Sequence, residues 1–110
     1  MAGVRRGDVR LHHFPPPDKL RPVVVLTRDS AIQYLDSVTV APITSSVRGI
    51  ASQVLLDEDD GMKMPCAVNL HYVLTVKKHA LGQRVAGLSA VRMAEICDAF
   101  NFATGCGSGD

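Results

Sequence analysis

The chain has 110 residues and a mass of 11.8 kDa, which fits one domain over residues 1–110 and excludes two independently folded catalytic domains. Its residues are 46% hydrophobic and 21% charged, which excludes a disordered chain. Only 5% are aromatic, so a nucleic-acid site built on stacked rings is not expected. The net charge is +1, yet residues 1–55 hold seven basic and four acidic side chains, a modest footprint for a polyanion.

The cysteines and the apolar segments indicate the compartment. Cys66, Cys97 and Cys106 are odd in number and lack the CxxC spacing, which predicts reduced thiols without a disulfide framework or a zinc site. No segment has the apolar length of a signal peptide or a membrane span. We therefore expect a soluble cytoplasmic protein.

Apolar periodicity predicts a chain made mainly of strands. The segment at 9–13 alternates after the turn at Gly7, and three prolines at 15–17 end it because proline cannot donate to a ladder. Four consecutive apolar residues at 23–26 predict a strand buried on both faces, which Pro22 can only begin. Residues 29–36 have weak helical character. In chain order the predicted strands are 9–13, 21–26, 37–41 (ending at 42–44), 53–56, 66–70, 73–76 and 83–86.

Two segments between these strands have loop composition. Residues 44–49 are rich in Ser, Thr and Gly. The acidic run at 57–61 lacks the ligand spacing of a calcium loop, which predicts a solvated turn.

The last predicted element is an amphipathic helix. Ser89 is its N-cap, Gly105 ends it, and a flexible tail follows at about 105–110. Phe102 falls on the opposite side from the apolar stripe, either as a lone exposed side chain or as an oligomer contact. The stripe consists of Met93, Ile96, Cys97, Phe100 and Ala103. Five to seven strands and this helix predict a mainly β fold, a small curved or barrel-like antiparallel sheet.

The histidines do not form a catalytic cluster in the sequence. His12 and His13 are neighbours on a strand and point to opposite faces, while His71 and His79 stand alone. The chain has no HxxxH, GxSxG or Walker motif, which excludes metalloproteases, α/β-hydrolases and P-loop enzymes.

An ordered set of segments resembles the MazF/PemK toxins over residues 4–104. No segment is decisive by itself, but their order and spacing are specific. They are RGDV at 6–9, RPVVV at 21–25, VAPITS at 40–45, AVNL at 67–70, LG at 81–82, GLS at 87–89 and the terminal helix.

This resemblance implies a fold and a function. The fold is an SH3-like barrel in a homodimer, with a C-terminal amphipathic helix. The function is that of a type II toxin: an endoribonuclease that cuts single-stranded RNA, often messenger RNA, without a metal or cofactor, and that a MazE-like antitoxin silences. Two alternatives stay open, a barrel toxin that binds and poisons DNA gyrase and a catalytically dead RNA-binding barrel, because a fold does not decide function.

The family's functional arginine and threonine match Arg21 and Thr44. In metal-free cleavage the ribose 2′-hydroxyl attacks the adjacent phosphate, which gives a 2′,3′-cyclic phosphate and a 5′-hydroxyl end. A guanidinium suits the charge that builds on the phosphoryl oxygens, but its permanent protonation argues against a general base. Arg21 is therefore expected to stabilise the transition state, with proton donation to the leaving oxygen as a second candidate role, and Thr44 to position phosphate. The structural alternatives are an ion pair at a strand edge for Arg21 and a turn cap for Thr44.

Five further residues are expected to bind RNA. They are Lys19, Ser45, Ser46, Arg48 and His71. The chain departs from the family at two of these places. The linker at 15–20 is short and proline-rich, and His71-Tyr72 replaces an acidic residue followed by Gln or Asn.

His71 generates a testable prediction. If it lies near the scissile phosphate, the cleavage rate changes as the pH crosses roughly 6 to 7, and His71→Asn flattens that profile. If it reads a base, His71→Asn shifts the cut sequence instead. Rate against pH and mapped cut sites separate the two roles, with His79→Asn as control. No change in either assay would leave His71 without a role.

Overall fold

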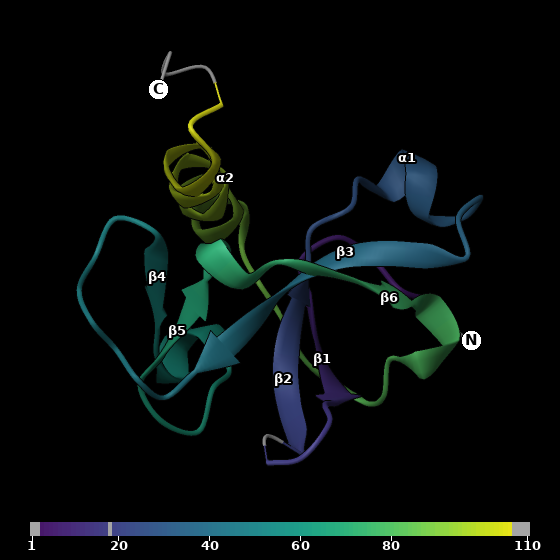
Figure 1. Cartoon of the computed structure of the whole chain (residues 1–110), viewed down its shortest axis with the longest axis horizontal. Helices are drawn as coiled ribbons and strands as arrows, with labels where there is room; N and C mark the ends of the chain where they lie inside the picture. The colour runs from purple at the N-terminus through teal and green to yellow at the C-terminus, as the bar shows by residue number, and fades with distance from the viewer. Residues whose placement is uncertain (1–2, 18, 107–110) are drawn as a thin grey trace.

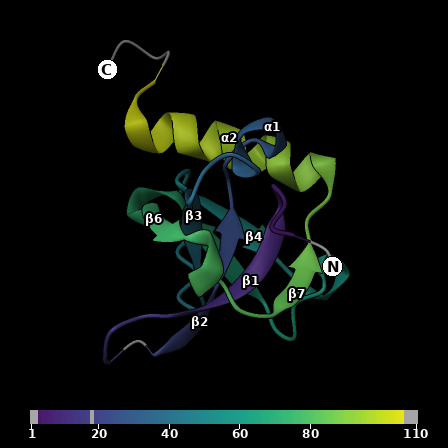
Figure 2. The same ribbon diagram turned by 90° about the vertical axis from the view of Figure 1, so that its right-hand side faces the viewer.

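The computed structural model describes residues 3–17 and 19–106. Within these residues one curled antiparallel sheet is crossed by the C-terminal helix (Figures 1 and 2). The strands are β1 (Asp8–His13), β2 (Leu20–Val25), β3 (Ser37–Thr44), β4 (Gln53–Leu56), β5 (Cys66–Asn69), β6 (Leu74–Lys77) and β7 (Arg84–Gly87). The helices are α1 (Asp29–Ile32) and α2 (Ala90–Thr104), with 3-10 turns at Glu58–Asp60, Leu70–Tyr72 and Lys78–Ala80. The expected fold class is confirmed.

The strand order is β4-β5-β3-β2-β1-β7, and β6 also pairs with β3. β3 is therefore the central strand, and it changes partners along its length. Its ladder with β2 ends at the pair Val23–Pro42, whereas Ile43 and Thr44 continue along β5. The sequence predicts a strand at 37–41 that ends at 42–44. In the structure β3 continues through Pro42 and ends at Thr44. β2 and β3 consequently part at one end of the sheet.

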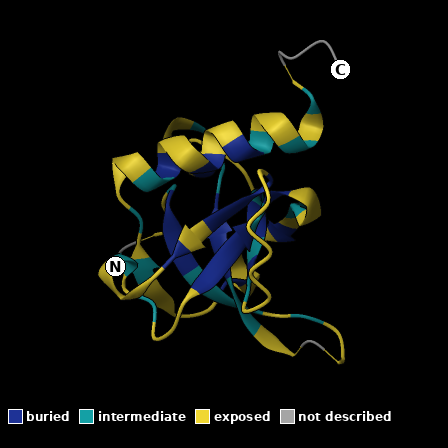
Figure 3. Cartoon of the chain, turned by 90° about the vertical axis from the view of Figure 1, so that its left-hand side faces the viewer, coloured by how far each residue is buried: buried dark blue, intermediate teal, exposed yellow. Residues whose placement is uncertain are grey.

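The sheet buries apolar side chains on both faces, in two separate clusters. Figure 3 shows buried residues, in dark blue, along its strands. Val24 lies in the cluster that α2 covers, together with Ile96. Val23 and Val25 lie in the other cluster, which includes Ile32 of α1. All three valines are fully buried, so the prediction of a strand covered on both faces is confirmed. This double burial fixes the register of β2 and hence the position of its first residues.

Helix α2 begins and ends where predicted. The Ser89 hydroxyl accepts a hydrogen bond from the Arg92 N–H (3.2 Å), and Gly105 takes the left-handed conformation with φ 71°. The predicted stripe is wrong at Cys97, which is exposed, while Ala99 is buried. The helix is rotated so that Ala99 faces the sheet. Cys97 lies at the side of the helix, where its Sγ accepts a hydrogen bond from the Arg6 guanidinium (3.2 Å). Phe102 is exposed, as expected, and residues 107–110 of the predicted tail lie outside the described residues.

The acidic run at 57–61, hereafter the acidic turn, is anchored to α2. Arg92 Nε donates to both carboxylate oxygens of Asp60 (3.0 and 3.2 Å), and the Asp57 N–H donates to the same carboxylate (3.0 Å). The prediction of a solvated turn is confirmed for residues 57–59 and wrong at Asp60, whose side chain is 9% exposed. The reason is nonlocal, because Arg92 is supplied by α2.

Other element boundaries differ little from the predictions. The weakly helical segment contains one helical turn, α1, and β6 begins at Leu74. No helix in the described part of the chain is long and apolar enough to cross a membrane.

The Asp60–Arg92 pair predicts pH-dependent stability. Burial by itself would raise the pKa of Asp60, but hydrogen bonds from Arg92 and the Asp57 backbone outweigh it and hold the pKa below its usual value. Asp60→Asn should lower the free energy of unfolding by about 1 to 3 kcal/mol at pH 7. Because the folded-state pKa is depressed, this difference persists above the unfolded value near 4 and disappears as the pH falls through the folded value.

Urea unfolding across this pH range measures the difference. Asp59→Asn is the matched control, because Asp59 is exposed in the same turn; its effect should stay within about 0.5 kcal/mol. A difference for Asp60→Asn that grows on acidification would contradict the assignment.

Candidate active site

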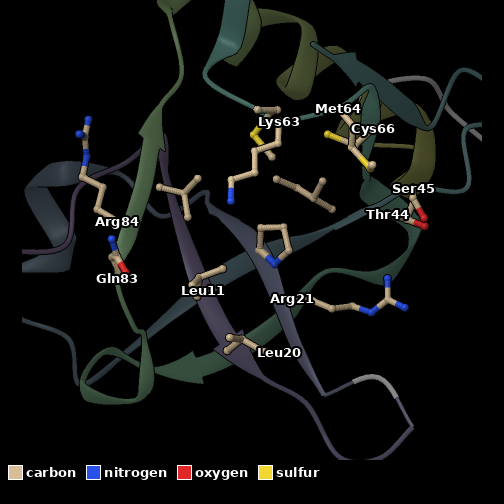
Figure 4. Close-up of a pocket in the computed structure, with 14 residues that line it drawn as sticks. Leu11, Leu20, Arg21, Thr44, Ser45, Lys63, Met64, Cys66, Gln83 and Arg84 are labelled. Atoms are coloured by element: carbon tan, nitrogen blue, oxygen red, sulfur yellow. The ribbon is translucent and has the colours of Figure 1, made fainter. Parts of the chain in front are cut away.

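Arg21 and Thr44 lie at the same end of the sheet. Arg21 is the second residue of β2 and Thr44 is the last of β3, and these strands are antiparallel. If the register of the Val23–Pro42 pair continued for two more residues, Arg21 would face Thr44. The ladder stops before that point, which leaves both side chains at the place where the strands part. Figure 4 shows the Arg21 guanidinium directed to the side of the pocket where Thr44 and Ser45 lie.

Two hollows meet at this place. The wide hollow has a volume of about 650 Å³ and the narrow hollow about 370 Å³. Both are lined by Arg21, Ile43 and Thr44, which therefore form the wall between them. A linear ligand that occupies both hollows therefore passes over Arg21 and Thr44.

The wide hollow combines an apolar floor with cationic side chains. Leu11, Leu20 and Pro22 form part of the floor, and Lys63 and Arg84 stand around it. In Figure 4 the Lys63 side chain reaches into the hollow. These features suit a flexible polyanion with apolar parts, such as a nucleic acid strand or an acidic peptide.

Arg84 is committed to an ion pair. Its Nε donates to the Asp8 carboxylate (3.0 Å), which is buried and also lies 3.5 Å from Arg10. Gly87 makes room for this arrangement, because a Cβ at that position would come within 2.2 Å of the Arg84 guanidinium. Arg84 therefore stabilises the β1–β7 edge while it lines the hollow.

The narrow hollow is partly aromatic. Phe14 and Tyr72 line it together with Asn69, and the Phe14 ring meets His12 edge to face with centroids 4.9 Å apart. Two of the five aromatic residues of the chain thus gather beside Arg21 and Thr44. Composition argues against a site built on stacked rings, but it does not predict local concentration. Stacking on aromatic rings and an amide at the rim are means of holding a nucleobase.

The Thr44 hydroxyl has a structural role that leaves its hydrogen for another acceptor. Its oxygen accepts a hydrogen bond from the Ser46 N–H (3.0 Å), which is the turn cap considered from the sequence. A hydroxyl that accepts one bond still donates one, so capping and contact with phosphate are compatible. Arg21 is half-buried.

The five expected RNA-binding residues divide into two groups. Ser45 lines the wide hollow. Lys19, Ser46, Arg48 and His71 are exposed and are not among the residues that line either hollow.

Buried Gln53 holds the loop at 46–48 beside the site. Its amide nitrogen donates to the Ser46 carbonyl (3.2 Å), and its oxygen accepts from the Arg48 N–H (2.8 Å). The His71 N–H donates to Asn69 Oδ1 (3.2 Å). Asn69, the partner in this hydrogen bond, and Tyr72, the residue after His71, both line the narrow hollow.

Sequence reasoning missed several lining residues. They are Phe14, Lys63, Asn69 and Tyr72. The departure from the family at His71-Tyr72 is a signal for the last of these, because it marks the turn that carries Tyr72. Lys63 follows the acidic turn and has no comparable signal, since only tertiary contacts bring it to β2.

The site contains a thiol but no cluster suited to a metal. Burial raises the pKa of the Cys66 thiol, so this side chain of the wide hollow stays protonated and apolar at pH 7. Among the described residues, no group of three His, Cys, Asp or Glu side chains is placed to hold a metal ion.

Comparisons with known proteins identify the family. The family model for the PemK-like, MazF-like toxin of type II toxin-antitoxin systems matches residues 5–103. The probable endoribonuclease MazF5 of Mycobacterium tuberculosis is 44% identical over 87 residues, which cover 78% of this chain and 80% of that protein. The endoribonuclease MazF3 of the same species is 37% identical over 87 residues, with 79% and 84% covered.

Solved structures agree with these relatives. The structure of the M. tuberculosis toxin MazF-mt6 superposes with a TM-score of 0.80 at 33% identity, covering 91% of this chain and 97% of that one. An endoribonuclease in complex with its cognate antitoxin, from a mycobacterial species, has a TM-score of 0.83 at 20% identity and supports the fold. The coverage is 94% of this chain and 96% of that one. This chain belongs to the PemK/MazF family of toxins of type II toxin–antitoxin systems.

Proposed function

We propose that this chain is an endoribonuclease that cleaves single-stranded RNA, messenger RNA included, as the toxin of its pair. The observation that carries the proposal is the position of Arg21 and Thr44 on the wall shared by two hollows. The relatives named as endoribonucleases support it. Nothing in these comparisons supports the alternative of a gyrase-binding toxin, which would need no such pair.

The two hollows support a path for the RNA strand. Each is large enough for part of a small ligand, and the wall between them is narrow because three residues line both. A strand with one nucleotide in each hollow places the linking phosphate over Arg21 and Thr44. In the narrow hollow the base stacks on Phe14 or Tyr72, and Asn69 contacts its edge.

The chemistry at the wall is a transesterification. The bond from the 2′-oxygen to phosphorus forms while the bond from phosphorus to the 5′-oxygen breaks. The 2′-hydroxyl proton passes to solvent water, and the leaving 5′-oxygen takes up a proton from solvent, so the step is balanced. The Arg21 guanidinium donates to the phosphoryl oxygens and to the leaving oxygen as their charge grows, and the Thr44 hydroxyl donates to a second oxygen. Neither step uses a metal ion or a cofactor.

The partners follow from the same surfaces. A MazE-like antitoxin with an acidic and apolar segment fits the wide hollow, where an apolar floor lies beside Lys63 and Arg84. We place the protein in the cytoplasm, where its substrate is, as one domain over residues 1–110.

Arg21→Ala and Thr44→Ala should each slow RNA cleavage by about 10²- to 10³-fold without unfolding the protein, because each removes a positioned donor. Purified protein is incubated with long RNA in EDTA, and the new ends are analysed for 2′,3′-cyclic phosphate and 5′-hydroxyl groups. Arg28→Ala and Thr75→Ala are matched controls, since both residues are exposed and do not line either hollow. Near-normal cleavage by the folded Arg21→Ala protein would refute its role.

We also infer a homodimer, as the family resemblance implies. Phe102 on α2 and Leu55 on β4 are 61% and 52% exposed and line one shallow surface of the monomer. Burying this surface in a second copy would remove apolar area from water. Sedimentation equilibrium at micromolar concentration should give twice 11.8 kDa, and Phe102→Ser should shift the mass toward the monomer. A monomer alone at these concentrations would contradict the dimer.

A further inference from the structure

Residues 62–64 connect the acidic turn to β5 and form part of the wall of the wide hollow. Lys63 is the charged residue of this segment. Figure 4 shows its side chain reaching into the hollow, whose other lining residues include Arg21 and Thr44. Besides Arg21 and the ion-paired Arg84, the hollow therefore presents Lys63 as a cation away from the wall where cleavage is proposed.

The charge of Lys63 is available to a ligand. Arg84 and Arg92 donate to Asp8 and Asp60, respectively. In the described part of the chain, by contrast, no carboxylate or hydrogen-bond acceptor contacts the Lys63 ammonium. A lysine ammonium on a long apolar stem binds phosphate as a compact point charge.

The backbone that carries Lys63 is held from three sides. The acidic turn is tied to α2 by Arg92 and Asp60. Gly61 has φ 91° and approaches β7 so closely that an added Cβ would lie 3.0 Å from Ala86 Cβ. Met62 packs against the core under α2. Because these contacts already order the segment, less conformational entropy is lost when an RNA strand binds to it.

We propose that Lys63 binds a backbone phosphate of the RNA other than the scissile one, and that the Asp60–Arg92 ion pair is a positioning device that holds Lys63 at the wide hollow. This inference rests on the proposed function, because it assigns a further contact of the same substrate. Lys63 adds binding that is equal in the ground state and the transition state, so it lowers KM and leaves kcat unchanged. Arg21 differs, since its donors act on the reacting phosphate.

The first experiment measures salt-dependent binding. A pool of short, random-sequence 2′-O-methyl RNA is used, because it lacks 2′-hydroxyls and cannot be cleaved. For Lys63→Gln, the slope of log Kd against log salt should become shallower by about 0.7, the value for one phosphate contact on a single strand. Lys77→Gln is the matched control, because Lys77 is exposed on β6 and lines neither hollow. In cleavage assays Lys63→Gln should raise KM with kcat retained.

The second experiment separates positioning from net charge. Asp60→Asn removes a negative charge, so a purely long-range electrostatic effect would tighten RNA binding. If the ion pair positions Lys63, Asp60→Asn weakens binding instead, by no more than Lys63→Gln does. When Lys63 is already Gln, Asp60→Asn no longer weakens binding, and only the slight tightening from the lost charge remains. Asp59→Asn removes the same charge from an exposed site in the same turn and should tighten binding slightly.

Each outcome supports or overturns one part of the proposal. Equal slopes for Lys63→Gln and Lys77→Gln would overturn the phosphate contact. Binding by Asp60→Asn that is unchanged or tighter would overturn the positioning role. Failure of the wild-type chain to bind the pool or to cleave RNA would defeat the proposed function and this inference together, whereas wild-type binding with no effect of Lys63→Gln would defeat the inference alone.

Discussion

The change of partner along β3 is the constraint on which the rest of the structure depends. Pro42 is the last residue of β3 paired with β2, and the next two residues run along β5. Proline has no N–H to extend the ladder toward a neighbouring strand. The two strands therefore part where β2 carries Arg21 and β3 carries Thr44, and the space that opens becomes two hollows with a common wall. The candidate active site is a consequence of how the sheet curls.

Two arginines of the described part of the chain are held by shielded carboxylates, whereas Lys63 is not. Asp8 engages Arg84 at the β1–β7 edge, and Asp60 engages Arg92 between the acidic turn and α2. Both carboxylates are largely shielded from water, so these pairs are screened less by salt than surface pairs are. Lys63 is left with an ammonium that faces the wide hollow. A chain with a net charge of only +1 thus concentrates positive charge where a polyanion would lie.

In the narrow hollow, aromatic residues are concentrated in the same way. Composition argues against a stacking site because five aromatic residues in 110 are few. The turn after β5 carries Tyr72 to the hollow, and the end of β1 leads to Phe14, so two rings and the Asn69 amide meet beside Arg21. One pocket needs only one or two rings, so an average over the chain is a weak guide to a local site.

The sequence by itself determined the order and type of the elements, the caps of α2 and the double burial of β2. Through the family resemblance it also predicted Arg21 and Thr44 as the site residues, which stays a prediction. These features follow from local periodicity, from cap residues and from the order of motifs, and each of these signals involves residues close in the chain. Tertiary structure alone decided that Asp60 is shielded by Arg92, that Cys97 rather than Ala99 is exposed on α2, and that Lys63 and Tyr72 line the hollows. Those outcomes depend on the register, the curl of the sheet and the rotation of a helix on it. Many weak contacts between residues distant in sequence set these quantities, and no local pattern encodes them.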